Sequence, residues 1–281
     1  MRKTTIIMAV ALLAAVLTGC GGDKDAKDKA ASAADTTDTA IVVPDTVSSA
    51  PETGDGTDEE TVKIDYEHSG RIQAVYESNT GYRGMKRTEI PPNGNLIGLF
   101  RGEDDTYYLK QEKITFEDDD GESGCGGGPT LALLSKAIFL FVNFTDYNKN
   151  KIQAIPLPNE YELKKWKSMP PNEKFTFNFG NEQYELEAFG KDVSGIIKNF
   201  SLVYSIKGTA NRQMIVSIPN VRHTTASLLF IGDLDGDGKP DIILDAPWDY
   251  ENVTIMVFLS STAKDGEYLR REAYNSAEFD C

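Results

Sequence analysis

Alternation of apolar and polar residues predicts β-strands over most of the chain after residue 60. Phe175, Phe177 and Phe179 fall on one face of a predicted strand, a turn follows at 180–182, and 183–188 alternates again. This is the pattern of a β-hairpin. Similar pairs of segments are 96–101 with 106–110, 195–206 with 213–218, and 253–259 with 268–273. The chain is therefore predicted to be mainly β, with antiparallel sheets and hairpins in a sandwich or barrel-like arrangement and little helix.

Two segments depart from this alternation. The run 131–144 is apolar apart from Ser135 and Lys136, so it fits a buried helix or one or two core strands, and it is too short to span a membrane. Periodicity does not decide between these structures. The segment 161–167, which is followed by two prolines, is the best candidate for a short helix.

The segment 231–245, IGDLDGDGKPDIILD, contains a regular series of acids. Positions one, three, five and nine of its loop are Asp233, Asp235, Asp237 and Asp241. Carboxylates this close repel one another unless a cation lies between them. Calcium meets this need because it takes roughly six to eight oxygen ligands, including a backbone carbonyl, here that of Lys239. A polar turn without metal is the alternative.

The flanking residues indicate which kind of calcium loop this is. An EF-hand needs a glutamate at loop position twelve, where this chain has Leu244. The flanks 227–231 and 241–244 are instead typical of short buried strands. A D-x-D-x-D-G-x-x-D loop between strands resembles the FG-GAP or VCBS calcium loop of integrin-like propellers and bacterial secreted proteins.

This resemblance implies a set of ligands for a calcium ion. Asp233, Asp235 and Asp237 would supply side-chain oxygens, Lys239 its carbonyl, and Asp241 a bidentate carboxylate. The chain contains no second D-x-D-x-D-G, whereas a propeller needs several comparable blades. We therefore expect a β domain with one calcium loop and not a multi-blade propeller.

The N-terminus has the features of an export signal. Arg2 and Lys3 precede an apolar stretch at 6–17, and Leu17-Thr-Gly-Cys20 follows. The sequence from Leu17 to Cys20 resembles the lipobox of bacterial lipoproteins. This resemblance implies a signal peptide at 1–19 and lipidation of Cys20. An ordinary signal peptide is the alternative. Several acyl chains give stable membrane anchoring. Gly21 stands where an inner-membrane retention signal has aspartate, so an outer-membrane lipoprotein is favoured, at the periplasmic face or the cell surface.

The segment 20–60 is predicted to be a disordered tether. It has no aromatic residue and is rich in Ala, Thr, Ser, Asp and Gly, so it cannot bury enough apolar surface to fold. Eleven acids against three lysines leave eight excess negative charges there, out of a formal net charge of −15 for the chain. Most of the charge is thus in the tether, and its sign argues against binding to nucleic acid.

The rest of the chain, 61–281, is long enough for one large domain or two small ones. It contains two cysteines, Cys125 and Cys281. In the oxidising cell envelope we expect a disulfide between them, with two free thiols as the alternative. No zinc-binding spacing, P-loop or G-x-S-x-G nucleophile motif occurs, and His223 is predicted to be a surface residue.

Trp248 and Tyr250 follow the calcium hairpin. Exposed aromatic rings beside calcium are suited to stacking against a sugar, although packing of both rings against the protein is the preferred interpretation. Two functions remain. The first is a non-enzymatic, lipid-anchored envelope module that binds a glycan or a protein, with calcium in a structural role. The second is an envelope hydrolase with an acidic site at Asp245, Asp249 and Glu251.

Overall fold

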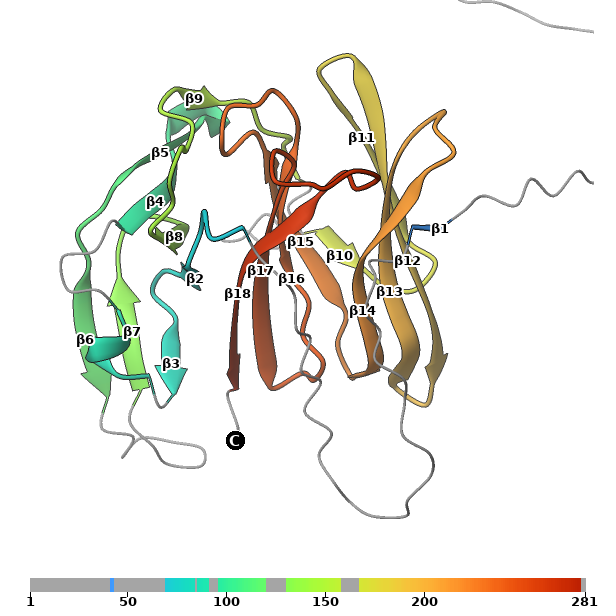
Figure 1. The fold of residues 1–281 in the computed structure, drawn as a ribbon. Coiled ribbons are helices and arrows are strands. Elements are labelled where there is room, and N and C mark those ends of the chain that lie inside the picture. The colour runs from blue at the N-terminus through green and yellow to red at the C-terminus, as the bar shows by residue number, and fades with distance from the viewer. Residues whose placement is uncertain are drawn as a thin grey trace, which may run out of the picture. The chain divides into compact units, whose positions relative to one another are not determined.

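The alternating segments form strands in four open sheets (Figure 1), so the mainly β prediction is confirmed. This computed structural model describes residues 41–42, 69–83, 85–90, 96–119, 130–157 and 167–278. All of them belong to one compact unit, Thr39–Cys281. Within this described part no helix is long and apolar enough to cross a lipid bilayer. The predicted signal peptide, Cys20, nearly all of the tether, Cys125 and Cys281 lie outside it.

Sheets A and D contain most of the C-terminal half. Sheet A has the order β1 (Ile41–Val42), β14 (Arg212–Arg222), β13 (Ile196–Ile206), β12 (Glu182–Val193) and β11 (Lys174–Phe179). Sheet D has the order β10 (Lys167–Met169), β15 (Ala226–Gly232), β16 (Asp241–Asp245), β17 (Asn252–Leu259) and β18 (Arg270–Glu278). Neighbouring strands are antiparallel, except that β1 pairs in parallel with β14.

Sheets B and C come from the preceding part of the chain and are antiparallel. Sheet B has the order β2 (Ala74–Glu77), β8 (Phe139–Val142), β4 (Leu96–Arg101), β5 (Tyr107–Gln111) and β9 (Lys151–Ile152). Sheet C has the order β3 (Gly81–Arg83), β7 (Thr130–Leu134) and β6 (Thr115–Asp119). The described helical residues are two short 3-10 turns, η1 (Arg87–Glu89) and η2 (Glu103–Asp105).

The four predicted hairpins and the strand–loop–strand unit at 227–244 are all present in these sheets. The apolar run 131–144 is two strands, β7 and β8, so the helix alternative is wrong. The helix candidate 161–167 lies outside the described residues except for Lys167, which begins strand β10.

Sheet D packs on both faces. One apolar cluster joins its Ile242 and Leu244 to sheet A residues such as Leu202, and a second joins Ile243 to sheet B residues such as Phe141. Since successive side chains of a strand point to opposite faces, β16 needs apolar residues at consecutive positions. A third cluster lies between sheets B and C. The loop between β15 and β16 is therefore attached to two strands that are buried on both faces, which makes a rigid base.

Candidate metal centre

The acidic loop connects β15 to β16, as the sequence predicts. Gly232 pairs with Asp241 and closes the hairpin. Gly236 and Gly238 have φ of 84° and 83°, in the left-handed region that favours glycine. These two glycines donate to Asp233: its Oδ1 accepts from the Gly236 N–H at 2.7 Å, and its Oδ2 accepts from the Gly238 N–H at 3.2 Å. The backbone of the loop is thus folded around the first aspartate.

Three of the four predicted aspartates converge. Three carboxylate oxygens, one each from Asp233, Asp235 and Asp237, lie within 4.8 Å of one another. Like charges at such distances raise the free energy of the folded state unless a cation or protons neutralise them. Oxygen-only donors of this kind match the preference of hard divalent cations.

Asp235 carries the most informative atom of the loop. Its side chain is 1% exposed, and its Oδ2 accepts from Arg71 Nη1 at 2.9 Å and from the Ser261 hydroxyl. Its Oδ1 is also buried and has no donor among the described residues. A buried carboxylate oxygen without a partner costs free energy, so this atom calls for a ligand that the described chain does not supply.

Asp237 is on the solvent side of the loop. Its Oδ1 accepts from the Lys239 N–H at 2.8 Å, and its Oδ2 accepts from the Ser260 hydroxyl at 2.9 Å. These bonds hold the third carboxylate over the other two. The role of the Lys239 carbonyl as a ligand remains a prediction.

Asp241 is fully buried and differs from the other three. Its Oδ2 accepts from the Leu234 N–H at 2.7 Å, and its Oδ1 accepts from Ser260, from the N–H at 2.8 Å and from the hydroxyl at 3.2 Å. It is not one of the three that converge within 4.8 Å. Its carboxylate links the acidic loop to the turn after β17, and its predicted bidentate contact with a metal remains a prediction.

The electrostatics of the loop are unfavourable without a cation. Burial raises the pKa of Asp241 well above its usual range, and the charge of Asp235 raises it further. Burial also raises the pKa of Asp233, although the two glycine N–H donors oppose this. When all four carboxylates are ionised, the guanidinium of Arg71, which is bonded to Asp235 and is the one cation paired with the loop among the described residues, leaves three excess negative charges. A divalent cation would offset most of this charge.

Sequence reasoning missed the residues that surround the loop. Arg71 donates to Asp235 from 164 positions away and also to the Asp146 carbonyl at 2.9 Å, while Asn148 Nδ2 donates to the Asp233 carbonyl at 3.2 Å. Ser260 and Ser261 come from the turn after β17. No local pattern marks these positions, because only the packing of sheets B and D brings them to the loop.

The two candidate stacking residues lie elsewhere. Trp248 and Tyr250 follow the calcium hairpin, as the sequence predicts, but they come after the end of β16 at Asp245, whereas the acidic loop precedes its start at Asp241. A five-residue strand separates the two sites. Trp248 is 42% exposed and Tyr250 is 61% exposed, so neither side chain is buried, although the Tyr250 ring also contacts the ring of His223.

Two of the acids predicted for a hydrolase site, Asp245 and Asp249, accept hydrogen bonds from backbone N–H groups close to them in the sequence. Asp245 is buried, and its Oδ1 accepts from the Thr254 N–H at 2.8 Å. Asp249 Oδ1 accepts from the Glu251 N–H at 3.2 Å. These bonds shape the connection between β16 and β17, at the end of β16 away from the acidic loop.

A search of protein-family models, curated proteins and solved structures found no match to this chain. The features of the described chain that bear on its function are the acidic loop and the surface at the other end of β16.

Proposed function

We propose that the protein is a lipid-anchored module of the bacterial cell envelope that binds a glycan or a protein, and that one calcium ion in the loop 233–241 holds its β domain together. The observation that carries the metal is the buried Oδ1 of Asp235, which has no donor among the described residues and lies beside two further carboxylates. One divalent cation would reduce the mutual repulsion of these acids and would also coordinate the Asp235 Oδ1.

Calcium suits this loop better than zinc or magnesium. The converging donors are carboxylate oxygens, and neither histidine nor cysteine is among them, which argues against zinc. Magnesium demands near-ideal octahedral geometry, whereas calcium accepts irregular oxygen cages. Hydrogen bonds already fix Asp233 and Asp237 in position, so a tolerant cation is favoured.

The contacts around the loop support a structural role for the ion. The loop is joined to Arg71, to Asn148 and to the turn at Ser260, three segments that are distant in the sequence. Neutralising the acids stabilises all of these contacts together. An ion that binds only the folded domain raises the free energy of unfolding according to its affinity and concentration.

The anchoring part of the proposal rests on the sequence 17–20. Changing Cys20 to Ala removes the thiol that would carry the lipid, so we expect the variant to move from the membrane to the soluble fraction of the producing cell. Fractionation followed by immunoblotting measures this, with Cys125→Ala as the control for loss of a cysteine. Membrane retention of the Cys20 variant equal to that of the wild type would refute lipidation at this residue.

A calcium titration tests the metal site. By isothermal titration calorimetry the wild-type protein should bind one calcium ion, with a dissociation constant on the order of 10⁻⁴ M as in extracellular calcium modules. Changing Asp235 to Ala should weaken binding by more than about tenfold, because it removes a charged ligand. Asp265→Ala is the matched control, since Asp265 is exposed and lies outside the loop. Equal affinities for the two variants would contradict the proposal.

A further inference from the structure

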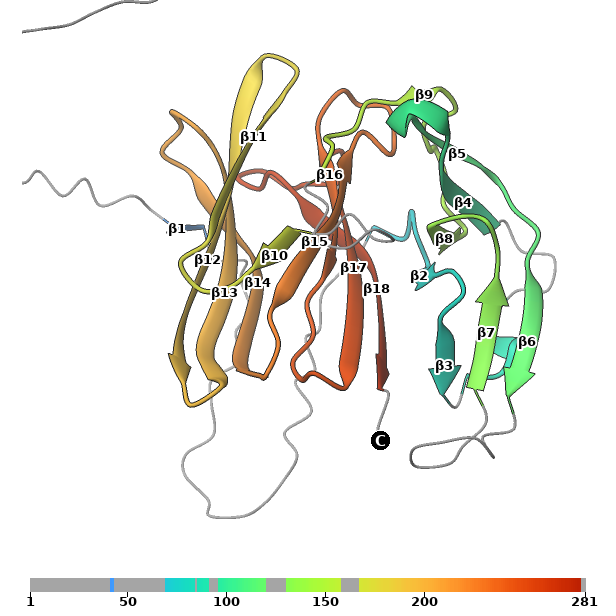
Figure 2. The same cartoon turned by 180° about the vertical axis from the view of Figure 1, so that it is seen from behind.

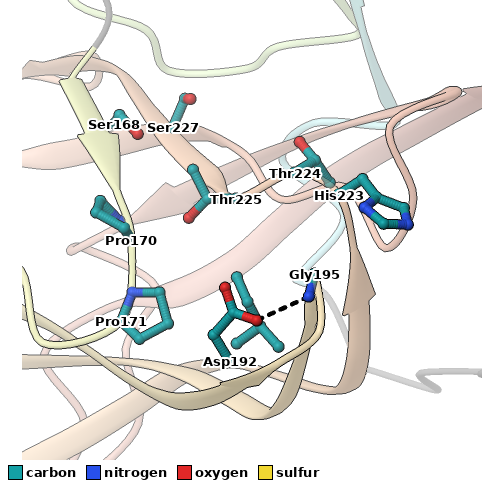
Figure 3. Close-up of a pocket in the computed structure, with 10 residues that line it drawn as sticks. Ser168, Pro170, Pro171, Asp192, Gly195, His223, Thr224, Thr225 and Ser227 are labelled. Carbon is teal, nitrogen blue, oxygen red and sulfur yellow. Dashed lines mark hydrogen bonds between the residues drawn. The ribbon is translucent and has the colours of Figure 1, made fainter.

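A pocket of about 500 Å³ lies at the end of β15 that is away from the acidic loop. Three segments line it: the end of β10 with Pro170 and Pro171, the turn between β12 and β13, and the connection from β14 to β15 (Figure 3). Strand β10 lies beside β15 in both overall views (Figures 1 and 2), and Ser168 pairs with Ser227. The pocket is thus formed where sheets A and D meet.

Hydroxyl groups with spare hydrogen-bonding capacity line this pocket. Ser168, Thr224 and Ser227 are half-buried, and their hydroxyls make no hydrogen bond to any other described residue. Thr225 donates its hydroxyl to the Met169 carbonyl at 2.8 Å and keeps its oxygen as an acceptor. Such a set can both donate to and accept from a ligand that carries several hydroxyl groups.

A carboxylate and an imidazole are held in place at the turn between β12 and β13. Asp192 Oδ1 accepts from the Gly195 N–H at 2.9 Å, which leaves Oδ2 for a ligand (Figure 3). The His223 N–H donates to the Gly195 carbonyl at 2.9 Å, and a Cβ on Gly195 would come within 2.7 Å of the imidazole. His223 has φ of 53°, in the left-handed region. The glycine thus lets the ring lie against the turn, and both polar groups are positioned before a ligand arrives.

The exposed aromatic residues stand next to this pocket. The ring of Tyr250 meets that of His223 edge-on, with centroids 6.2 Å apart. The Trp248 carbonyl accepts from the Arg222 N–H at 2.9 Å, which ties the aromatic turn to the strand end that leads into the pocket. With exposed fractions of 61% and 42%, the side chains of Tyr250 and Trp248 are accessible to a ligand that extends out of the pocket.

We infer that this pocket binds a neutral saccharide, which specifies the ligand class of the binding function proposed above and rests on it. Sugars present hydroxyl groups around the ring edge and apolar C–H groups on its face. The hydroxyls and Asp192 match the edge, whereas Pro170, Pro171 and Ile197 provide apolar surface for the face. Among the described residues, the lining has a carboxylate and neither lysine nor arginine, which disfavours an anionic ligand.

Saturation-transfer NMR on the full-length protein in calcium tests the inference, with cellotriose, maltotriose and chitotriose as probes and glucose 6-phosphate as the anionic comparison. At least one trisaccharide should bind, and glucose 6-phosphate should bind more weakly. Asp192→Ala and Tyr250→Ala should each weaken binding by about tenfold, as expected when a charged hydrogen bond or a stacked ring is lost. Tyr274→Ala is the matched control, since Tyr274 is 55% exposed on strand β18 and does not line the pocket.

Calorimetric calcium titration of the same samples separates this inference from the metal proposal. Asp192→Ala should bind calcium like the wild type, which also shows that the variant is folded. A protein that binds calcium but none of the three trisaccharides overturns the pocket inference and leaves the metal site intact. Trisaccharide binding that Asp192→Ala and Tyr250→Ala leave unchanged overturns it as well. Trisaccharide binding without calcium binding contradicts the metal site alone.

Discussion

Chelation of calcium is expected to lower the melting temperature of the protein by about 5–10 °C. An ion present at about a hundred times its dissociation constant stabilises the folded state by about 2.7 kcal/mol, and a domain of this size shifts by about 2–4 °C per kcal/mol. The physical source is the neutralisation of Asp233, Asp235 and Asp237 and the pairing of the buried Asp235 Oδ1. Differential scanning fluorimetry in calcium and in EGTA measures the shift.

The variant Asp235→Ala identifies the origin of that shift. It loses a calcium ligand together with the bonds to Arg71 and Ser261, so its melting temperature in calcium should be lower than that of the wild type. The decisive result is the difference between the buffers, which should nearly vanish in Asp235→Ala and persist in Asp265→Ala. Identical melting curves of the wild type in calcium and EGTA would rule out a stabilising metal.

The difference in the wild-type melting temperature between calcium and EGTA should be smaller at acid pH. Without metal, burial raises the folded-state pKa of Asp233 and Asp241 above the unfolded value. Protonation of these two acids therefore favours the folded state at low pH, and that contribution is lost as the pH rises through the raised pKa. Calcium needs the ionised carboxylates and competes with these protons. We expect a smaller calcium shift at pH 5 than at pH 7.

Sequence patterns predicted the strands best where one face of a sheet is polar. β12 alternates at Tyr184, Leu186 and Ala188, and this signal was sufficient. The run 131–144 gave no such signal, because in β8 Leu140 and Val142 pack toward sheet C while Phe139 and Phe141 pack toward sheet D. A strand that is buried on both faces has no polar side from which its period can be read.

In the candidate sites, residues that are close together in the sequence were predicted, whereas residues that come from distant segments were not. The acidic loop was predictable because its aspartates are within nine positions of one another. Its partners Arg71 and Ser260 were not, since the sheets bring them there from remote parts of the chain. The pocket at Asp192 and His223 was missed for the same reason, because its three segments share no motif. Trp248 is close to the loop in the sequence, but the strand between them separates the two sites.

Replacement of Asp241 by Ala is expected to lower the free energy of unfolding by about 2–6 kcal/mol. The substitution leaves the buried N–H groups of Leu234 and Ser260 without their acceptor, and each unsatisfied group costs about 1–3 kcal/mol. Urea denaturation in calcium, followed by tryptophan fluorescence, measures the loss, with Asp265→Ala as the control. A loss below about 0.5 kcal/mol, the range typical of surface substitutions, would contradict the role of Asp241 as a link between the two turns.

Comparing Asp241→Ala in calcium and in EGTA then separates the two roles of this carboxylate. If Asp241 only joins the acidic loop to the turn at Ser260, the variant is destabilised but still gains stability from calcium. If Asp241 is also a ligand, as the resemblance to FG-GAP loops implies, the gain from calcium disappears along with the stability. Because Asp241 is not one of the three carboxylates that converge within 4.8 Å of one another, we expect the first result: a destabilised variant whose calcium shift persists.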